Sequence, residues 1–249
     1  MSSLMPAIEY ASTAVGYRSP ARYVARARFL FDAVDLHGKR VLEVGCGTGA
    51  WVVWAALHGA SHVLGLEPEA DGASSGSLIA CKRLVDALSL GDRVQVSAVR
   101  IEDLTDVRPF DVVVMYGVIN HLDEKAVVAI HRDHRAAAKF VTILRHLKTL
   151  LVPGALVIAT EAGRKNLWNQ LGLRSPFAPG QEWDKHQEPE VWISIFGQAG
   201  FQFLDLRWQP LYPFGRLSAH RLAQFATASH FVLRFQAPDR VEEVEQAAR

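Results

Sequence analysis

The chain has 249 residues, 49% of them hydrophobic, with 27 lysines and arginines against 26 aspartates and glutamates. This near-neutral balance gives no electrostatic signal for nucleic acid or an anionic membrane, and the two cysteines are too few and too far apart for a disulfide framework or a thiolate zinc site. The N-terminus lacks the basic start and apolar core of a signal peptide, and no apolar run approaches the roughly 18 residues of a membrane span. We therefore expect a cytoplasmic protein that binds neither nucleic acid nor membrane.

Short apolar runs alternate with amphipathic segments along the chain, which is typical of a parallel sheet covered by helices. A lead-in over residues 1–37 contains a predicted helix at 20–30. The main domain is predicted over residues 38–237, with strands at 40–44, 62–66, 93–98, 110–115, 155–160, 201–208 and 230–235. Helices are predicted between these strands at 50–58, about 74–88 and 124–151. Asp123 is the predicted N-cap of the last of these helices, and Pro153-Gly154 its predicted end.

Two long segments interrupt this rhythm. Residues 161–190 are rich in Gly, Pro, Trp, Asn and Gln, which predicts an ordered loop, and residues 209–228 separate the last two strands. Long loops in compact domains are often functional, so both insertions are candidate site regions. Residues 238–249 form a charged tail without a strand pattern.

The segment Arg40-Val-Leu-Glu-Val-Gly-Cys-Gly-Thr-Gly-Ala-Trp51 places a glycine loop between the first strand and its helix. Gly45, Gly47 and Gly49 allow the backbone to turn tightly and a ligand to approach it closely, and Cys46 between them is a small side chain that we expect to be buried. Gly45, Gly47 and Ala50 also satisfy the G-x-G-x-x-A form of nicotinamide-binding proteins, so the loop by itself leaves two kinds of cofactor open.

Two acidic residues next to this loop distinguish the cofactors. Glu43 precedes the first glycine by two residues, where a carboxylate would repel a pyrophosphate but suit the cationic methionyl end of S-adenosylmethionine (SAM). Glu67 follows the second strand, close to the offset of about 20 residues at which an acidic side chain meets ribose hydroxyls. Together they favour SAM.

At this point the sequence resembles the class I SAM-dependent methyltransferase family, over roughly residues 38–235. The matching motifs are VLEVGCGTG (41–49), GLEPE (65–69), RIEDL (100–104), FDVVVMYGVINHL (110–122) and LLVPGALVIATE (150–161). The resemblance implies a Rossmann-like α/β fold, with a seven-stranded, mostly parallel sheet whose last strand is antiparallel and whose faces carry helices. It also implies SAM as cofactor and S-adenosylhomocysteine as product.

The resemblance implies roles for individual residues as well. Glu67, with Pro68 beside it, would bind the ribose hydroxyls, and Gly45 to Gly49 would line the methionyl portion. The remaining implied cofactor contacts are Ile101 and Glu102 at the adenine, and Gly117 to Asn120 after the fourth strand. Arg100 stands where many relatives have an aspartate, so Glu102 or a backbone carbonyl would accept from the adenine amino group.

The lead-in contributes a further candidate pair. Tyr17 and Arg18, in the sequence GYRSP, either close over the cofactor or dock the lead-in helix.

If the methyl acceptor is a hydroxyl, a base should remove its proton, and histidine is the usual base near neutral pH. His186 lies in the first insertion, and His121 follows the fourth strand; each could instead be a structural residue. The segment 182–187 adds mixed polar and aromatic side chains suited to a polar substrate, namely Glu182, Trp183, Lys185 and Gln187. This loop also resembles that of bacterial methyltransferases of polysaccharide or glycoside modification, which implies O-methylation of a sugar-like small-molecule acceptor.

Two other functions stay open: a nicotinamide-dependent oxidoreductase, and a non-catalytic SAM-binding or interaction protein whose insertions bind a partner. His131 and His134 share a predicted helical face with Asp133, but a solvated face explains them better than a metal, so no metal site is expected. The sequence is compatible with a homodimer.

Overall fold

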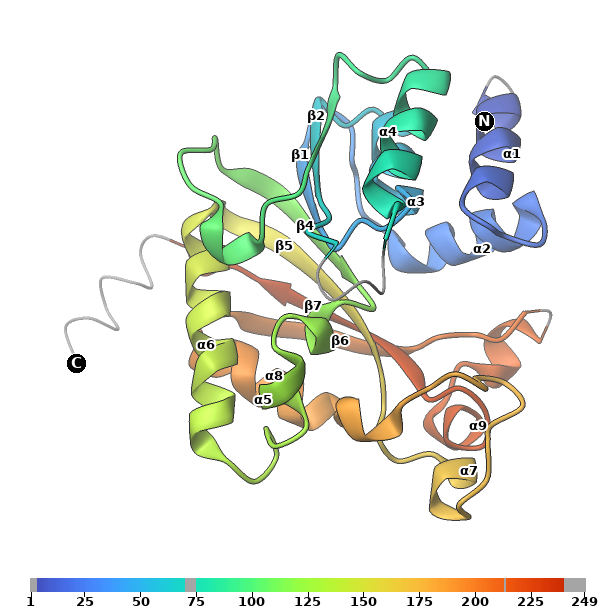
Figure 1. Ribbon diagram of the computed structural model, residues 1–249, viewed down its shortest axis with the longest axis vertical. Helices are drawn as coiled ribbons and strands as arrows, with labels where there is room; N and C mark the ends of the chain where they lie inside the picture. The colour runs from blue at the N-terminus through green and yellow to red at the C-terminus, as the bar shows by residue number, and fades with distance from the viewer. Residues whose placement is uncertain (1–3, 70–74, 213, 240–249) are drawn as a thin grey trace. The chain divides into compact units, whose positions relative to one another are not determined.

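The computed structural model describes residues 4–69, 75–212 and 214–239, so residues 240–249 of the predicted tail lie outside the described part. The strands form a seven-stranded sheet in the order β3-β2-β1-β4-β5-β7-β6. Their bounds are β1 Arg40–Val44, β2 His62–Leu66, β3 Val94–Ser97, β4 Phe110–Tyr116, β5 Leu151–Ala162, β6 Gln202–Trp208 and β7 His230–Gln236. The predicted Rossmann-like fold is therefore confirmed, and the chain divides into two compact units (Figure 1).

The first unit comprises Met1–Val114 and Leu150–Val152. Its helices are α1 Met5–Ala14, α2 Pro20–Leu30, α3 Ala50–Leu57 and α4 Ser77–Ala87. Strand β2 pairs in parallel with β1 on one side and β3 on the other, and α3 packs against β1 and β2. The apolar runs of β1 and β2 are buried, as strands covered by helices require, whereas the edge strand β3 buries only Val94.

An aromatic cluster packs the lead-in against α3 of this unit. The Tyr23 ring of α2 is fully buried, stacks on Trp51 with 5.7 Å between ring centroids, and meets Trp54 edge-on at 5.5 Å. Its hydroxyl donates to the Ala50 carbonyl at 2.5 Å. Such aromatic pairs contribute about 0.5–1.5 kcal/mol beyond the area they bury, so this cluster positions the lead-in on the first turn of α3.

The second unit comprises Met115–Thr149 and Pro153–Arg249. Its helices are α5 Glu124–Val127, α6 His134–Thr149, α7 Leu167–Gln170, α8 Pro189–Gln198 and α9 Arg221–Phe225. Helix α8 packs against α6 and against β6 and β7 (Figure 1), and its Phe196 stacks on Phe235 of β7 with 3.9 Å between ring centroids. The last strand, β7, is antiparallel to both β5 and β6, as predicted.

The predicted single helix over 124–151 is wrong. The structure has two helices, because Asp133 accepts the Arg135 N–H at 2.8 Å and so caps the start of α6 at His134. His131 therefore lies outside α6, and the shared helical face predicted for His131 and His134 does not form. Residues 153–154 do not end a helix either, since they belong to β5.

Other elements were not predicted from the sequence. They include α1, α8 and the short helices inside the insertions. Strand β5 was predicted, but it extends beyond its predicted bounds at both ends. Among the described residues, no helix has the length and apolar character to cross a bilayer.

The predicted N-cap at Asp123 is confirmed, since its carboxylate accepts the Ala126 N–H at 2.8 Å at the start of α5. We expect Asp123→Ala to lower the free energy of unfolding by about 1 kcal/mol, because it leaves a helix N–H without an acceptor. Denaturant unfolding measures this loss. Asp123→Asn keeps a capping oxygen and serves as the control; if both variants lost the same stability, the cap would not be the cause.

Candidate functional site

The glycine loop of the first unit leaves β1 with three successive glycines in the left-handed region. The φ angles of Gly45, Gly47 and Gly49 are 69°, 49° and 93°. A Cβ on Gly49 would lie 2.5 Å from the Cys81 sulfur, so the start of α3 has no room for a side chain. A Cβ on Gly47 would meet nothing within 4 Å, so this part of the loop faces open space. The loop therefore presents bare backbone to a ligand, as predicted from its glycines.

Glu67 holds this loop from the end of β2. One carboxylate oxygen accepts the Gly47 N–H at 2.7 Å, and the other accepts the Glu69 N–H at 3.4 Å. The side chain is largely buried, with 7% of its surface exposed. The offset of 20 residues that suggested a ribose-binding role thus also places Glu67 against the glycine backbone.

Glu43 lies deeper, with 2% of its surface exposed. Burial raises the pKa of its carboxyl well above the ordinary value, and the nearby Cys81 adds to the shift. Burial therefore opposes the anionic form of Glu43, on which the sequence-based choice of SAM over a pyrophosphate cofactor was argued. Its Oε2 has no hydrogen-bond partner among the described residues. This unpaired acceptor, the open glycine backbone and the Glu67 carboxylate fit the polar groups of SAM.

The other predicted cofactor residues of this unit differ in exposure. Tyr17 contacts the rings of Tyr23 and Trp51, at 5.2 and 6.3 Å between centroids, which supports the alternative that it docks the lead-in. Among the other predicted cofactor residues, Arg18 and Glu102 are exposed, Pro68 is half-buried and Ile101 is buried.

Cys46 in the glycine loop is buried, and both a hydrogen bond with Cys81 and burial raise the pKa of its thiol, as expected for an unreactive side chain.

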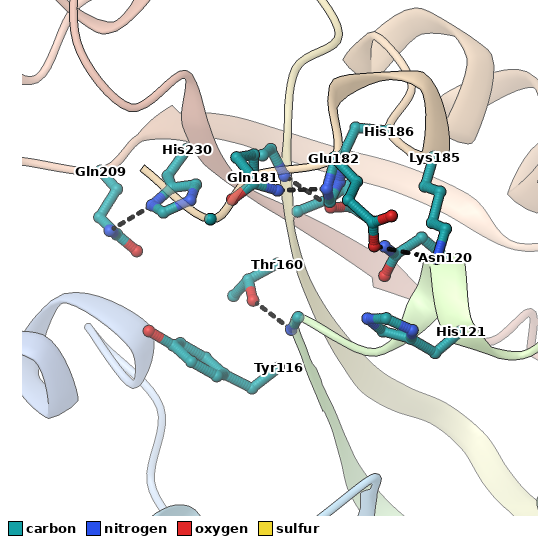
Figure 2. A pocket seen from close by; sticks show the side chains of 14 residues that line it. Tyr116, Asn120, His121, Thr160, Gln181, Glu182, Lys185, His186, Gln209 and His230 are labelled. Carbon is teal, nitrogen blue, oxygen red and sulfur yellow. Dashed lines mark hydrogen bonds and ion pairs between the residues drawn. The ribbon is translucent and has the colours of Figure 1, made fainter. Parts of the chain in front are cut away.

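The second unit contains a polar pocket of about 310 Å³, within the size range of small-molecule sites. In Figure 2, Gln209 and His230 lie on one side of this pocket, and Glu182, Lys185 and His186 on the other. It is lined by Tyr116, Gly117, Asn120, His121, Thr160, Glu161, Ala162, Gly180, Gln181, Glu182, Lys185, His186, Gln209 and His230.

His186 is the most constrained titratable side chain in this pocket. Its Nδ1 lies 2.6 Å from Glu161 Oε1, and both side chains are buried. The carboxylate oxygen can only accept, so Nδ1–H donates to it, and in the neutral imidazole Nε2 is then the acceptor. In this structure the Gln181 amide occupies Nε2. A histidine whose proton-accepting nitrogen is oriented by a buried carboxylate has the geometry of a general base.

His121 forms a second, exposed pair at the pocket. Its Nδ1 lies 2.6 Å from Glu124 Oε1, and Lys185 Nζ donates to Glu124 at 3.0 Å and to Glu182 at 2.9 Å. Hydrogen bonds from His121 and Lys185 lower the pKa of Glu124, and those to Glu182 and Glu124 raise the pKa of Lys185. The structure therefore brings both predicted histidines and two of the predicted substrate residues to one pocket.

Two predicted substrate residues do not line it. Trp183 is buried, and Gln187 is 1% exposed, with its amide donating to the Val127 carbonyl at 2.7 Å. Conversely, several residues that line the pocket had no predicted role, and Glu161 is the most important of them. The sequence feature that could have indicated a role for Glu161 is its position at the end of the fifth apolar run, because parallel strands present ligand-binding side chains at their carboxyl ends.

Glu43→Gln tests the environment of the buried carboxyl. Above the ordinary pKa of 4.5, a carboxyl with a raised pKa binds more protons in the folded state than in the unfolded one, so wild-type stability falls as pH rises. We expect Glu43→Gln, which cannot ionise, to gain stability relative to wild type between about pH 5 and about pH 8. Denaturant titrations at both pH values check this, with the exposed Glu102→Gln as control. A difference that stays constant with pH would contradict the raised pKa.

Comparisons with known proteins identify the family by sequence and support the fold by structure. Residues 17–206 match the model of a methyltransferase domain. A ubiquinone biosynthesis O-methyltransferase of Neisseria meningitidis is 32% identical over 195 residues, covering 73% of this chain and 71% of the relative. Among solved structures, a SAM-dependent methyltransferase from Mesorhizobium loti has a TM-score of 0.57 at 15% identity, covering 90% of this chain and 99% of that one. The 4+2 cyclase SpnF has a TM-score of 0.61 at 16% identity, covering 95% and 93%. The chain therefore belongs to the class I SAM-dependent methyltransferase family.

Proposed function

We propose that this protein methylates a hydroxyl of a small polar acceptor, with His186 as the general base. The observation that carries this proposal is the buried hydrogen bond between His186 and Glu161 in a pocket lined mostly by polar side chains. Family membership alone would not identify the acceptor, because one fold hosts many substrates.

SAM, when bound, supplies a methyl group already attached to a good leaving group, so the protein has to position the acceptor, exclude water and manage one proton. In the first unit, Glu67 and the backbone of Gly45 to Gly49 would hold the cofactor. In the second unit, Gly117 has a φ of 62° and no atom within 4 Å of where its Cβ would lie, which leaves backbone open to a ligand. Asn120 is 2% exposed, and its Oδ1 has no partner among the described residues.

His186 would handle the proton. The acceptor hydroxyl takes the place of the Gln181 amide at Nε2, and its proton moves to Nε2 as the oxygen gains the methyl group. The imidazolium that results donates from both nitrogens, and the Glu161 carboxylate stabilises the charge through Nδ1. His121 has a similar partner in Glu124 but is exposed, so water competes with that hydrogen bond.

A polar acceptor such as a sugar or glycoside suits this lining. Imidazole, carboxylate, amide and hydroxyl groups surround the pocket, and hydrogen bonds from such groups fix the orientation of a polyol. Oxygen as the methylated atom is supported by the relative named as an O-methyltransferase. The membership of the methyltransferase family leaves the nicotinamide-dependent oxidoreductase without support.

Release of S-adenosylhomocysteine tests the proposal. Purified protein is incubated with SAM and a panel of hydroxylated acceptors: methyl glycosides, catechol and cyclohexane-1,2-diol, with phenol and cyclohexanol as mono-hydroxylated partners. We expect release that depends on an acceptor. Binding of SAM without release across the whole panel would favour the non-catalytic SAM-binding protein instead.

His186→Ala separates chemistry from cofactor binding. Removing a general base typically costs about 10²- to 10⁴-fold in turnover, so we expect a loss of this size in kcat with SAM affinity unchanged. Steady-state kinetics and calorimetric titration measure the two quantities. His121→Ala is the matched control and should lose less; the reverse order would move the base to His121.

Glu67→Ala tests the cofactor map. The variant loses a carboxylate that bonds the glycine loop and that would also bind the ribose of SAM. Hydrogen bonds to charged groups are worth about 1.5–3 kcal/mol, so the affinity for SAM should fall about 10- to 100-fold. Glu69→Ala is the control, because this neighbouring carboxylate accepts the Leu78 N–H outside the glycine loop. Equal SAM affinity in wild type and Glu67→Ala would contradict the assignment.

A further inference from the structure

The carboxylate of Glu161 is only half used by the protein. Its Oε1 accepts from His186 Nδ1 at 2.6 Å and from the Ala162 N–H at 2.7 Å. Its Oε2 is buried and has no hydrogen-bond partner among the described residues. The side chain is 5% exposed and lines the polar pocket. A buried charged acceptor without a donor is costly, so this oxygen needs an explanation.

Three side-chain donors in or next to the pocket are engaged elsewhere. The Gln181 amide donates to His186, and Lys185 pairs with Glu124 and Glu182. Gln187, one residue beyond His186, donates to the Val127 carbonyl. A ligand that enters the pocket can supply the donor these side chains do not.

We propose that the acceptor is a diol or polyol, in which the hydroxyl to be methylated meets His186 Nε2 and a second hydroxyl donates to Glu161 Oε2. This inference rests on the proposed function, since it assumes that His186 faces the reacting hydroxyl. Glu161 then has two roles: it positions His186 through one oxygen and selects the acceptor through the other. A mono-hydroxylated compound would leave the buried Oε2 unpaired.

Glu161→Gln separates these roles. The amide carbonyl can still accept from His186 Nδ1 and the Ala162 N–H, while the amide NH₂ replaces Oε2. The oxygen that can accept a hydrogen bond in wild type is thus replaced by a donor, with little change in side-chain shape. The variant should therefore lose its preference for a second hydroxyl to a greater extent than its ability to orient His186.

The experiment compares each diol with its mono-hydroxylated partner: catechol with phenol, and cyclohexane-1,2-diol with cyclohexanol. For wild type we expect kcat/KM to favour the diol by about tenfold or more, because a site built to bond a hydroxyl rejects an analogue that lacks it. In Glu161→Gln this ratio should fall, because the second hydroxyl can then only accept from a neutral amide and loses its charge-assisted hydrogen bond to the carboxylate. Calorimetric titration of the same pairs into protein saturated with S-adenosylhomocysteine gives a second readout that needs no turnover. Glu190→Gln, an exposed carboxylate on α8 outside the pocket, is the control.

Each other outcome counts against a different statement. Equal kcat/KM for diol and mono-hydroxylated compound in wild type would overturn the inference and leave the proposed function standing. An equal loss for both compounds in Glu161→Gln would reduce Glu161 to a positioning residue and also overturn it. If no compound led to release of S-adenosylhomocysteine, the proposed function would fail. The inference would then stand only if the titrations showed that wild type binds the diols more tightly and that Glu161→Gln weakens this preference; otherwise it would fail as well.

Discussion

The hydrogen bond between His186 and Glu161 joins the end of β5 to a segment 25 residues further along the chain. A second bond, from the Lys165 N–H to Glu188 Oε1 at 2.7 Å, ties the two ends of that segment together. Because His186 and Glu161 are buried, water does not compete for their hydrogen bond, and the bond is stronger than it would be at the surface. This contact makes an ordered wall of the pocket out of a segment rich in glycine and proline.

The pocket is assembled from segments that are distant in sequence. Tyr116 ends β4, Thr160 and Glu161 lie near the end of β5, His186 comes from the first insertion, and His230 begins β7. Strand ends in an open α/β sheet bring side chains to one edge, and the insertions add the groups that the strands do not provide. The family fold therefore positions the strand ends, while the insertions contribute further residues to the lining of the pocket.

Three buried glutamates show how the surroundings of one residue type set its role. Glu67 is satisfied by backbone N–H groups and orders the glycine loop. Glu43 has an oxygen without a hydrogen-bond partner among the described residues, and burial raises the pKa of its carboxyl. Glu161 bonds His186 through one oxygen, and its other, buried oxygen has no hydrogen-bond partner among the described residues. Composition alone does not distinguish these three cases.

The sequence by itself determined the sheet, the glycine loop and the position of Glu67. These follow from local patterns, since apolar runs define strands, glycines permit the turn, and the distance from Gly47 to Glu67 is set by one β-α-β unit. The break before α6 and the helices α1 and α8 escaped prediction, because a single capping side chain or a tertiary contact decided them. Only the tertiary structure paired His186 with Glu161, buried Gln187 away from the pocket and raised the pKa of Glu43. Burial and long-range hydrogen bonds depend on which segments meet in space, and local periodicity carries no information about that.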